Sequence, residues 1–287
     1  MAILTLTTDL GLRDHYVAAL KGQLLSVLPA LRIVDISHDV QPFDLAQAAY
    51  FLNNISGDFP SGTIHFIGVD TIPEIRLNGA VNRFPVAANI ADQYFVGCDN
   101  GIFSLLKHQD NVKSIVRLEG FSTKQALRFP ARHIYVPAML RLLQGEHIND
   151  IGERTDSFNK VFEVQPAVGE NLIKGRIIHT NKYGNVIVNV TEKLFGEVGK
   201  GNPFGIYLRT NSYFIDRISE NYHEVPQGEK LALFNENGLL EIAINKGIEG
   251  SGGGAANLLG LRQGDMVRIE FEPRGSKDNL EDLFKGA

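Results

Sequence analysis

The sequence contains a single cysteine, Cys98. One thiol forms no intramolecular disulfide and no cysteine-rich zinc site. Long apolar runs are also missing, because none approaches the roughly 20 residues that a bilayer-spanning helix needs. Lys and Arg together number 28 against 33 Asp and Glu, a formal net charge of -5. This balance argues against a dedicated nucleic-acid binder, which usually presents a basic face. We therefore expect neither a membrane nor a nucleic acid as a partner.

The first residues lack the basic segment followed by an apolar segment that marks a secretory signal peptide. They are instead typical of a strand, so we expect a cytoplasmic protein. Hydrophobic residues make up 44% of the 287 positions and charged residues 21%, which is ordinary globular composition. A chain of this length is long enough to form two domains.

The first half of the sequence alternates between strand-like and helix-like stretches, which is typical of an α/β layer domain. Expected strands are residues 3–7, 32–36, 63–69, 86–90 and 94–96, and expected helices are 16–28, 44–53, 101–107 and 134–144. The strand at 63–69 is almost continuously apolar, as a buried parallel strand should be. We predict an α/β N-terminal domain with a mainly parallel sheet over residues 1–165.

The second half loses most of its helical periodicity. Short strands are expected at 175–179, 186–190, 204–208, 230–234, 239–244 and 266–271, separated by glycine- and asparagine-containing turns. This pattern predicts a smaller all-β domain, a barrel, over residues 166–287. Its tail from residue 273 is polar and is expected to be frayed or weakly helical.

Acidic residues follow several of the predicted strands, where ligands of α/β sheets usually bind. Asp9 precedes a glycine turn, and its carboxylate could accept hydrogen bonds from a vicinal diol such as that of ribose. Alternatively, Asp9 caps that turn and Asp14 caps the following helix. Asp70 is followed by Arg76; such a pair lowers the Asp pKa and could orient a water molecule. The alternative is a surface loop of solvated charges.

Other polar motifs allow both a functional and a purely structural interpretation. The Asp-Asn-Gly string at residues 99–101 is a strong turn signal by itself. His133 lies near a helix start, where a lone histidine is more often structural than catalytic. Asn181 and Asn185 flank a turn, and their amides could contact an adenine edge or an amino-acid carboxylate. The glycine-rich segment at 250–254 is flexible enough for a close approach to a ligand, but it has no phosphate-loop pattern.

Taken together and in order, these motifs resemble one family. They are TTDLGLRD at 7–14, VDISHDV at 34–40 with PFD at 42–44, VD at 69–70, YFVG at 94–97 with DNG at 99–101, YGN at 183–185, LLEIA at 239–243, LGL at 259–261 and GD at 264–265. The sequence thus resembles the S-adenosyl-L-methionine (SAM) hydroxide adenosyltransferases, relatives of the SAM-dependent fluorinases and chlorinases. The resemblance covers nearly the whole chain.

The resemblance implies attack of water at the ribose C5′ of SAM, releasing adenosine and L-methionine, with SAM as substrate and no cofactor or metal. It also implies a homotrimer that binds SAM between the N-domain of one subunit and the C-domain of the next. In this interpretation Asp9 would hold the ribose diol and Asp70 would position the water. Further catalytic candidates are Arg76 and His133, and further substrate-binding candidates are Asp14, Asn181, Asn185, Asn237 and Ser251.

The sequence departs from the family pattern at several of these positions. Pro130 stands where the family has a histidine, and His133 where it has an aspartate. Asn181 replaces a common aspartate, and Asn237 stands where an aromatic residue often lies near adenine. The alternatives are therefore a protein that binds adenosine or SAM without efficient turnover, or an enzyme acting on another adenosyl substrate. A halide nucleophile is disfavoured, because Asp70 would repel an anion.

Overall fold

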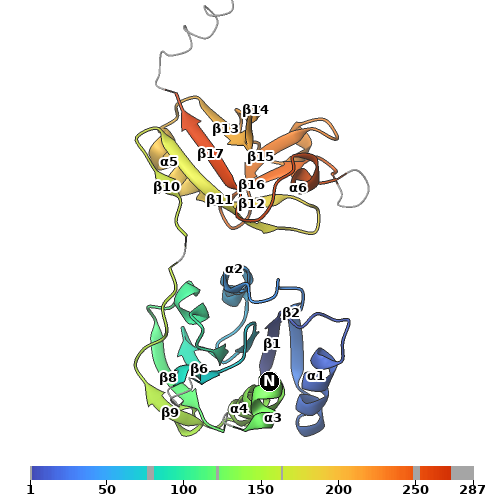
Figure 1. Ribbon diagram of the computed structural model, residues 1–287, viewed down its shortest axis with the longest axis vertical. Coiled ribbons are helices and arrows are strands. Elements are labelled where there is room, and N and C mark those ends of the chain that lie inside the picture. The colour runs from blue at the N-terminus through green and yellow to red at the C-terminus, as the bar shows by residue number, and fades with distance from the viewer. Residues whose placement is uncertain (1, 76–80, 121–122, 163, 248–252, 273–287) are drawn as a thin grey trace, which may run out of the picture. The chain divides into compact units, whose positions relative to one another are not determined.

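The computed structural model describes residues 2–75, 81–120, 123–162, 164–247 and 253–272. The chain divides into two compact units, Met1–Glu163 and Val164–Ala287, coloured from blue to green and from yellow to red in Figure 1. Buried apolar residues form separate clusters within each unit. Each unit is therefore described as a body with its own core.

The first unit is built on a seven-stranded mixed sheet. In spatial order its strands are β2 (Arg32–Ser37), β1 (Ile3–Thr8), β3 (Ile64–Gly68), β7 (Gln93–Cys98), β6 (Pro85–Ile90), β8 (Val112–Leu118) and β9 (Gly152–Thr155). The pairs from β2 to β7 are parallel, whereas those from β7 to β9 are antiparallel.

The expectation of a mainly parallel sheet is thus corrected to a mixed one. The reason lies in the two residues that join β6 to β7, Ala91 and Asp92, which both have positive φ, 49° and 64°. Such a two-residue turn joins antiparallel neighbours, whereas a parallel neighbour requires a crossover of a dozen or more residues.

Helices cover both faces of this sheet. They are α1 (Tyr16–Val27), α2 (Leu45–Ile55), α3 (Lys124–Arg128) and α4 (Val136–Leu143), with a π-helical turn at Ala131–Tyr135 before α4 and 3-10 turns at Ser56–Asp58, Ile102–Leu105 and Ile148–Asp150. Helices α1 and α4 pack with β1 residues such as Leu4 and Leu6 in one cluster. Helix α2 packs in another cluster with Ile67 and Val69, from β3 and the residue that follows it. A small hairpin of β4 (Glu74–Ile75) and β5 (Val81–Arg83) follows β3.

The second unit is a nearly closed antiparallel sheet. It contains β10 (Ala167–Val168), β11 (Leu172–Thr180), β12 (Val186–Thr191), β13 (Phe204–Leu208), β14 (Thr210–Ile215), β15 (Lys230–Phe234), β16 (Leu239–Ile244) and β17 (Met266–Phe271), with α5 (Glu192–Gly199), α6 (Ala255–Leu258) and a 3-10 turn at Tyr222–Glu224. The edges of the sheet approach each other where Ile218, which follows β14, forms a bridge with Ala232 of β15. Among the described residues, no helix is long and apolar enough to cross a membrane.

The buried His65 lies on β3 in the middle of the first sheet. Its side chain is fully buried, and its Nδ1 lies 2.8 Å from Thr5 Oγ1 in a hydrogen bond. Its ring stacks on Phe95 with 4.8 Å between centroids. Burial lowers the pKa of His65 to about 4, although a hydrogen bond with Gln93 acts in the opposite direction.

This pKa predicts a pH-dependent loss of stability. The unfolded chain binds a proton at His65 as the pH falls through 6.5, whereas the folded chain does so only near 4. The contribution is therefore present above pH 6.5, and about 2 kcal/mol of it is lost between pH 7 and pH 5. In urea unfolding followed by circular dichroism, His65→Phe should show that much less pH dependence than the wild type. Equal dependence in both proteins would contradict the prediction.

Candidate active site

Two carboxylates meet where the parallel strands β1 and β3 end. Asp9 directly follows β1, and Asp70 lies two residues beyond β3. Asp9 Oδ2 accepts hydrogen bonds from the backbone N–H groups of Asp70 at 3.4 Å and Phe43 at 3.1 Å. Both carboxylates are half-buried, at the sheet edge where α/β proteins usually bind ligands. The structure thus brings the predicted Asp9 and Asp70 together.

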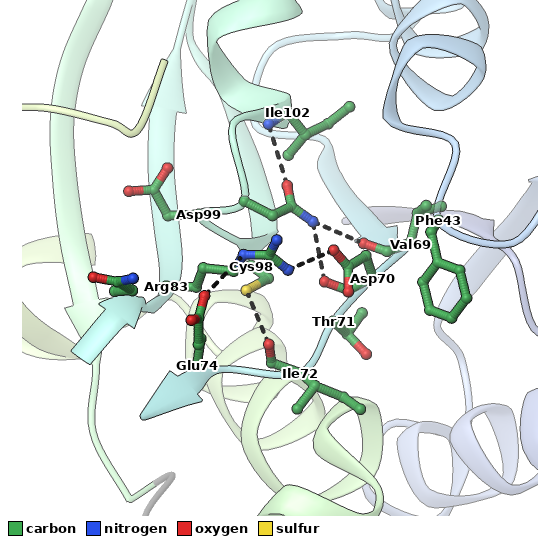
Figure 2. A network of polar contacts seen from close by, with 12 residues as sticks. Phe43, Val69, Asp70, Thr71, Ile72, Glu74, Arg83, Cys98, Asp99 and Ile102 are labelled. Carbon is green, nitrogen blue, oxygen red and sulfur yellow. Dashed lines mark hydrogen bonds and ion pairs between the residues drawn. The ribbon is translucent and has the colours of Figure 1, made fainter. Parts of the chain in front are cut away.

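The backbone at Asp70 is held in a strained conformation. Its φ of 46° lies in the left-handed region, which costs a non-glycine residue about 1 kcal/mol or more. The buried Asn100 side chain stabilises this turn, because its Nδ2 donates to Val69 O at 3.2 Å and to Asp70 O at 3.0 Å. Asn100 Oδ1 in turn accepts from Ile102 N at 3.2 Å (Figure 2). A residue predicted only as part of a turn therefore positions a candidate catalytic carboxylate.

The cation that pairs with Asp70 is Arg83, the last residue of β5. Its Nη1 donates to Asp70 Oδ2 at 2.7 Å, and its Nε lies 3.6 Å from Glu74 Oε2 (Figure 2). The predicted partner, Arg76, lies outside the described residues. Counting positions along the loop missed Arg83, because the β4–β5 hairpin folds back on itself and returns a distant residue to Asp70. An arginine at the end of a strand-like run was the available signal.

Two buried side chains donate to backbone carbonyl oxygens of the loop after Asp70. Tyr135 Oη donates to Thr71 O at 2.9 Å, and Cys98 Sγ contacts Ile72 O at 3.7 Å. Burial raises the pKa of the Cys98 thiol to about 12 and the pKa of Tyr135 well above its ordinary value. Both groups therefore keep their protons at neutral pH and remain donors.

His133 lies on the π-helical turn two residues before Tyr135, and its side chain is exposed. Among the described residues, its ring makes no hydrogen bond or ion pair. Pro130, at the position of the family's histidine, is buried at the start of the same turn. The structure therefore shows no contact between His133 and Asp70.

Asp99, next to this site, has a structural role: it binds the backbone at Asn159. Its buried carboxylate accepts from Asn159 N with both oxygens, at 2.9 and 3.0 Å. Burial raises the pKa of Asp99, although the hydrogen bonds from Asn159 lower it in part. Gly101 has a φ of 105°, and a Cβ there would lie 2.3 Å from Val161 Cγ1. The Asp-Asn-Gly string thus anchors the segment around residues 159–161, while its middle residue supports Asp70.

A second polar network fixes the turn that carries Asp9. Thr8 Oγ1 and His38 Nδ1 are hydrogen-bonded at 2.8 Å, and His38 O accepts from Gly11 N at 2.8 Å. His38 Nε2 lies 3.2 Å from Asp35 Oδ1, and Lys21 Nζ lies 2.5 Å from Asp35 Oδ2. Burial alone would raise the pKa of Asp35, but the hydrogen bonds from Lys21 and His38 hold it below its ordinary value.

Asp14 lies apart from these networks. It is exposed just before α1, whose N-cap residue is His15 with no side-chain capping bond. Among the described residues, the Asp14 carboxylate makes no hydrogen bond or ion pair. It therefore does not cap the helix, which was the structural alternative for this residue.

In the second unit, Asn181 and Asn185 shape one turn. Asn181 Oδ1 accepts from Tyr183 N at 3.0 Å and from Asn185 N at 3.1 Å. The buried Asn185 side chain donates from Nδ2 to Glu241 Oε1 at 2.8 Å. The backbone of Gly254 packs directly on this turn, since an added Cβ would lie 2.2 Å from Tyr183 O.

Asn237 and Ser251 do not join that turn in the described structure. Asn237 is exposed in the turn between β15 and β16. The next residue, Gly238, accepts a hydrogen bond at its carbonyl oxygen from Glu192 N, which directly follows the C-terminal end of β12. Asn185 immediately precedes the other end of β12. The length of this strand therefore separates the two asparagines. Ser251 lies outside the described residues.

Among the described residues, no group of three or more His, Cys, Asp or Glu side chains could hold a metal ion. The donors and acceptors at the strand ends are instead one carboxylate pair, one guanidinium and backbone groups. Such a set can bind hydroxyl groups and orient a water molecule.

Comparisons with known proteins match the same two units. A family model described as the SAM hydroxide adenosyltransferase N-terminal domain matches residues 4–152, and one described as the C-terminal domain matches residues 175–268. An (R)-S-adenosyl-L-methionine hydrolase of Methanocaldococcus jannaschii is 30% identical over 66% of each chain. One of Thermus thermophilus is 27% identical over 91% of this chain and 97% of its own.

Two further similarities differ in extent. A fluorinase of Nocardia brasiliensis is 42% identical, but over only 22% of this chain and 21% of its own. The crystal structure of an uncharacterized conserved protein from Thermotoga maritima superposes with a TM-score of 0.77 at 26% identity, covering 94% of this chain and 99% of that one.

The role of Asn100 leads to a stability prediction. Asn100→Asp replaces the amide donor by a carboxylate that faces two carbonyl oxygens, so the free energy of unfolding should fall by about 1–3 kcal/mol. Urea unfolding at pH 7 measures this change, and the exposed Asn149→Asp in the same unit is the matched control. Equal losses in the two variants would show that the amide does not hold the turn.

Proposed function

Because this chain belongs to the SAM hydroxide adenosyltransferase family, we propose that it hydrolyses SAM to adenosine and L-methionine by attack of water at the ribose C5′. The observation that carries the proposal is the ion pair of Asp70 and Arg83 beside Asp9 at the ends of two parallel strands. This arrangement offers a fixed carboxylate for the water and a second carboxylate for the ribose.

The sulfonium of SAM is already a good leaving group, so the reaction needs no general acid. The oxygen of water forms a bond to C5′ while the C5′–S bond breaks, and the electron pair stays on the sulfur of methionine. The site must align the water, exclude other solvent and receive the proton that water loses.

Asp70 suits the task of orienting this water. Its Oδ2 is engaged by Arg83 at 2.7 Å, while its Oδ1 accepts no hydrogen bond within the part of the chain that is described. The contact with Arg83 fixes the orientation of the Asp70 carboxylate. We therefore assign Oδ1 to the water and Arg83 to positioning Asp70. Arg76 and His133 remain alternatives for the cation and the proton acceptor.

Asp9 suits the ribose diol for a related reason. Its Oδ2 is occupied by two backbone N–H groups, whereas its Oδ1 accepts no hydrogen bond from the described residues. That oxygen can accept from one or both vicinal hydroxyls. We propose Asn185 and Asn181 for the nucleobase end of the substrate, with Asp14, Asn237 and Ser251 as further binding candidates.

A second candidate function is binding of adenosine or SAM without efficient turnover. The buried Pro130 favours it, because proline cannot accept a proton where the family has a histidine. The two functions differ in one measurable product, adenosine released from SAM.

Chromatography of adenosine and methionine after incubation with SAM tests the proposal. Asp70→Asn removes the acceptor charge and should lower kcat by about 100-fold or more, as expected for a group that handles the proton of the nucleophile. Arg83→Ala should lower kcat less, because its charge acts through Asp70. The control is Asp110→Asn, an exposed aspartate of the same unit, which should keep wild-type turnover.

Two further variants decide between the candidate groups. A larger loss in Arg76→Ala than in Arg83→Ala would assign the supporting cation to Arg76. A loss in His133→Gln as large as in Asp70→Asn would make His133 the proton acceptor. If the wild type binds adenosine but releases none from SAM over hours, the binding function replaces the hydrolase.

We also propose, from the family resemblance, a homotrimer in which two subunits share each substrate. Light scattering of the full chain should then give three times the chain mass of 31.7 kDa. Co-expression of Asp70→Asn with Asn185→Ala should restore part of the activity, because some mixed sites receive both wild-type residues. A monomer mass, or no recovery in the mixture, would contradict the shared site.

A further inference from the structure

A buried carboxylate in the second unit has no part in the function proposed so far. Glu241 lies on β16, opposite Ile187 of β12, with 3% of its surface exposed. Its Oε1 accepts hydrogen bonds from Asn185 Nδ2 and from Tyr222 Oη, each at 2.8 Å. A buried carboxylate is destabilising unless donors surround it, so these two contacts make its burial possible.

This carboxylate fixes the orientation of the Asn185 amide. Glu241 Oε1 accepts from Asn185 Nδ2, so the Asn185 amide directs its NH2 group toward Glu241 and its Oδ1 away from it. Tyr222 also remains a donor, because burial and the contact with Glu241 raise its pKa. Within the described residues, Asn185 Oδ1 accepts no hydrogen bond and is thus available to a ligand.

The backbone around Asn185 is fixed as well. Asn181 and Asn185 exchange hydrogen bonds across their turn, with Asn181 N donating to Asn185 O at 3.0 Å. Ala256 N donates to Gly184 O at 2.8 Å, so the start of α6 is joined to the same turn. The amide therefore presents its Oδ1 in one direction.

The free oxygen matches one class of nucleobase. Asn185 Nδ2 is engaged by Glu241 and by Tyr222, whereas Oδ1 is an acceptor that can pair with the 6-amino group of adenine. A 6-oxopurine carries an acceptor at position 6, which would face Asn185 Oδ1 without a proton between them. The fixed orientation thus favours a 6-amino group.

We propose that Glu241 is a positioning residue that determines nucleobase specificity: it holds the Asn185 amide so that the protein binds 6-aminopurine nucleosides and rejects 6-oxopurine nucleosides. The inference rests on the proposed function, in that it takes a purine nucleoside as the ligand. It adds the residue that sets which purine is bound.

Calorimetric binding to the full-length wild type provides the first test, with adenosine and inosine as ligands. Adenosine should bind at least about 10-fold more tightly than inosine, because inosine leaves Asn185 Oδ1 without a hydrogen-bond donor. Equal affinity for adenosine and inosine would overturn the inference, and this comparison requires no variant.

Glu241→Gln is the second test, because a glutamine at this position can either donate or accept and lets the Asn185 amide rotate. The ratio of inosine to adenosine dissociation constants should fall toward one. Tyr222→Phe is the matched control, since it removes the other hydrogen bond to the same oxygen but leaves the Asn185 contact. It should keep the wild-type ratio. A purely structural role predicts equal weakening of both nucleosides in Glu241→Gln, which would overturn the inference.

The two hypotheses fail in different ways. If the wild type releases adenosine from SAM but binds adenosine and inosine equally, the inference is wrong and the hydrolase stands. If it prefers adenosine and the preference depends on Glu241, but it releases nothing from SAM, the inference stands and the hydrolase is wrong.

Discussion

The backbone at the end of β3 must turn sharply, and the donors that satisfy its carbonyl groups make the rest of the site possible. Asp70 adopts a left-handed conformation there, and the Asn100 amide bonds the carbonyl oxygens on both sides of that turn. The Asp9 carboxylate accepts the Asp70 N–H from the neighbouring strand. One turn, held from two directions, thereby orients the Asp70 side chain toward Arg83. Without these contacts the two carboxylates would have no fixed geometry.

The sequence was sufficient to place Asp9 and Asp70 at the ends of strands, where ligands of α/β sheets usually bind. Only the structure shows that the two residues are hydrogen-bonded neighbours. The sequence was insufficient to predict that Arg83 pairs with Asp70. This contact depends on the antiparallel pairing of β4 with β5, which spacing along the chain does not show. The antiparallel pairing of β6 with β7 was missed in the fold class, although both strands were expected. The two-residue connection through Ala91 and Asp92 determines that direction.

In the second unit, too, the sequence did not show which residues strand pairing brings together. The asparagine-containing turn at 181–185 was recognisable from its residue types, but the strand register that separates Asn237 from it was not. Glu241 carried a signal that was not used, namely an acidic side chain within the otherwise apolar strand β16. Such a residue needs buried donors, and only the fold shows that Asn185 and Tyr222 supply them.

In the proposed site, the charge of Asp70 also limits which nucleophile can react. An anion 4 Å from a carboxylate at an effective dielectric constant near 20 is repelled by about 4 kcal/mol, of which Arg83 offsets a part. Water is neutral and escapes this repulsion, and it develops positive charge on its hydrogens as its oxygen attacks carbon. A nearby carboxylate therefore stabilises water in the transition state more than in the ground state, whereas for a halide it is unfavourable in both. With Asp70 in its proposed role, the ion pair of Asp70 and Arg83 thus favours water over a halide as the nucleophile, even though fluorinases are relatives of this chain.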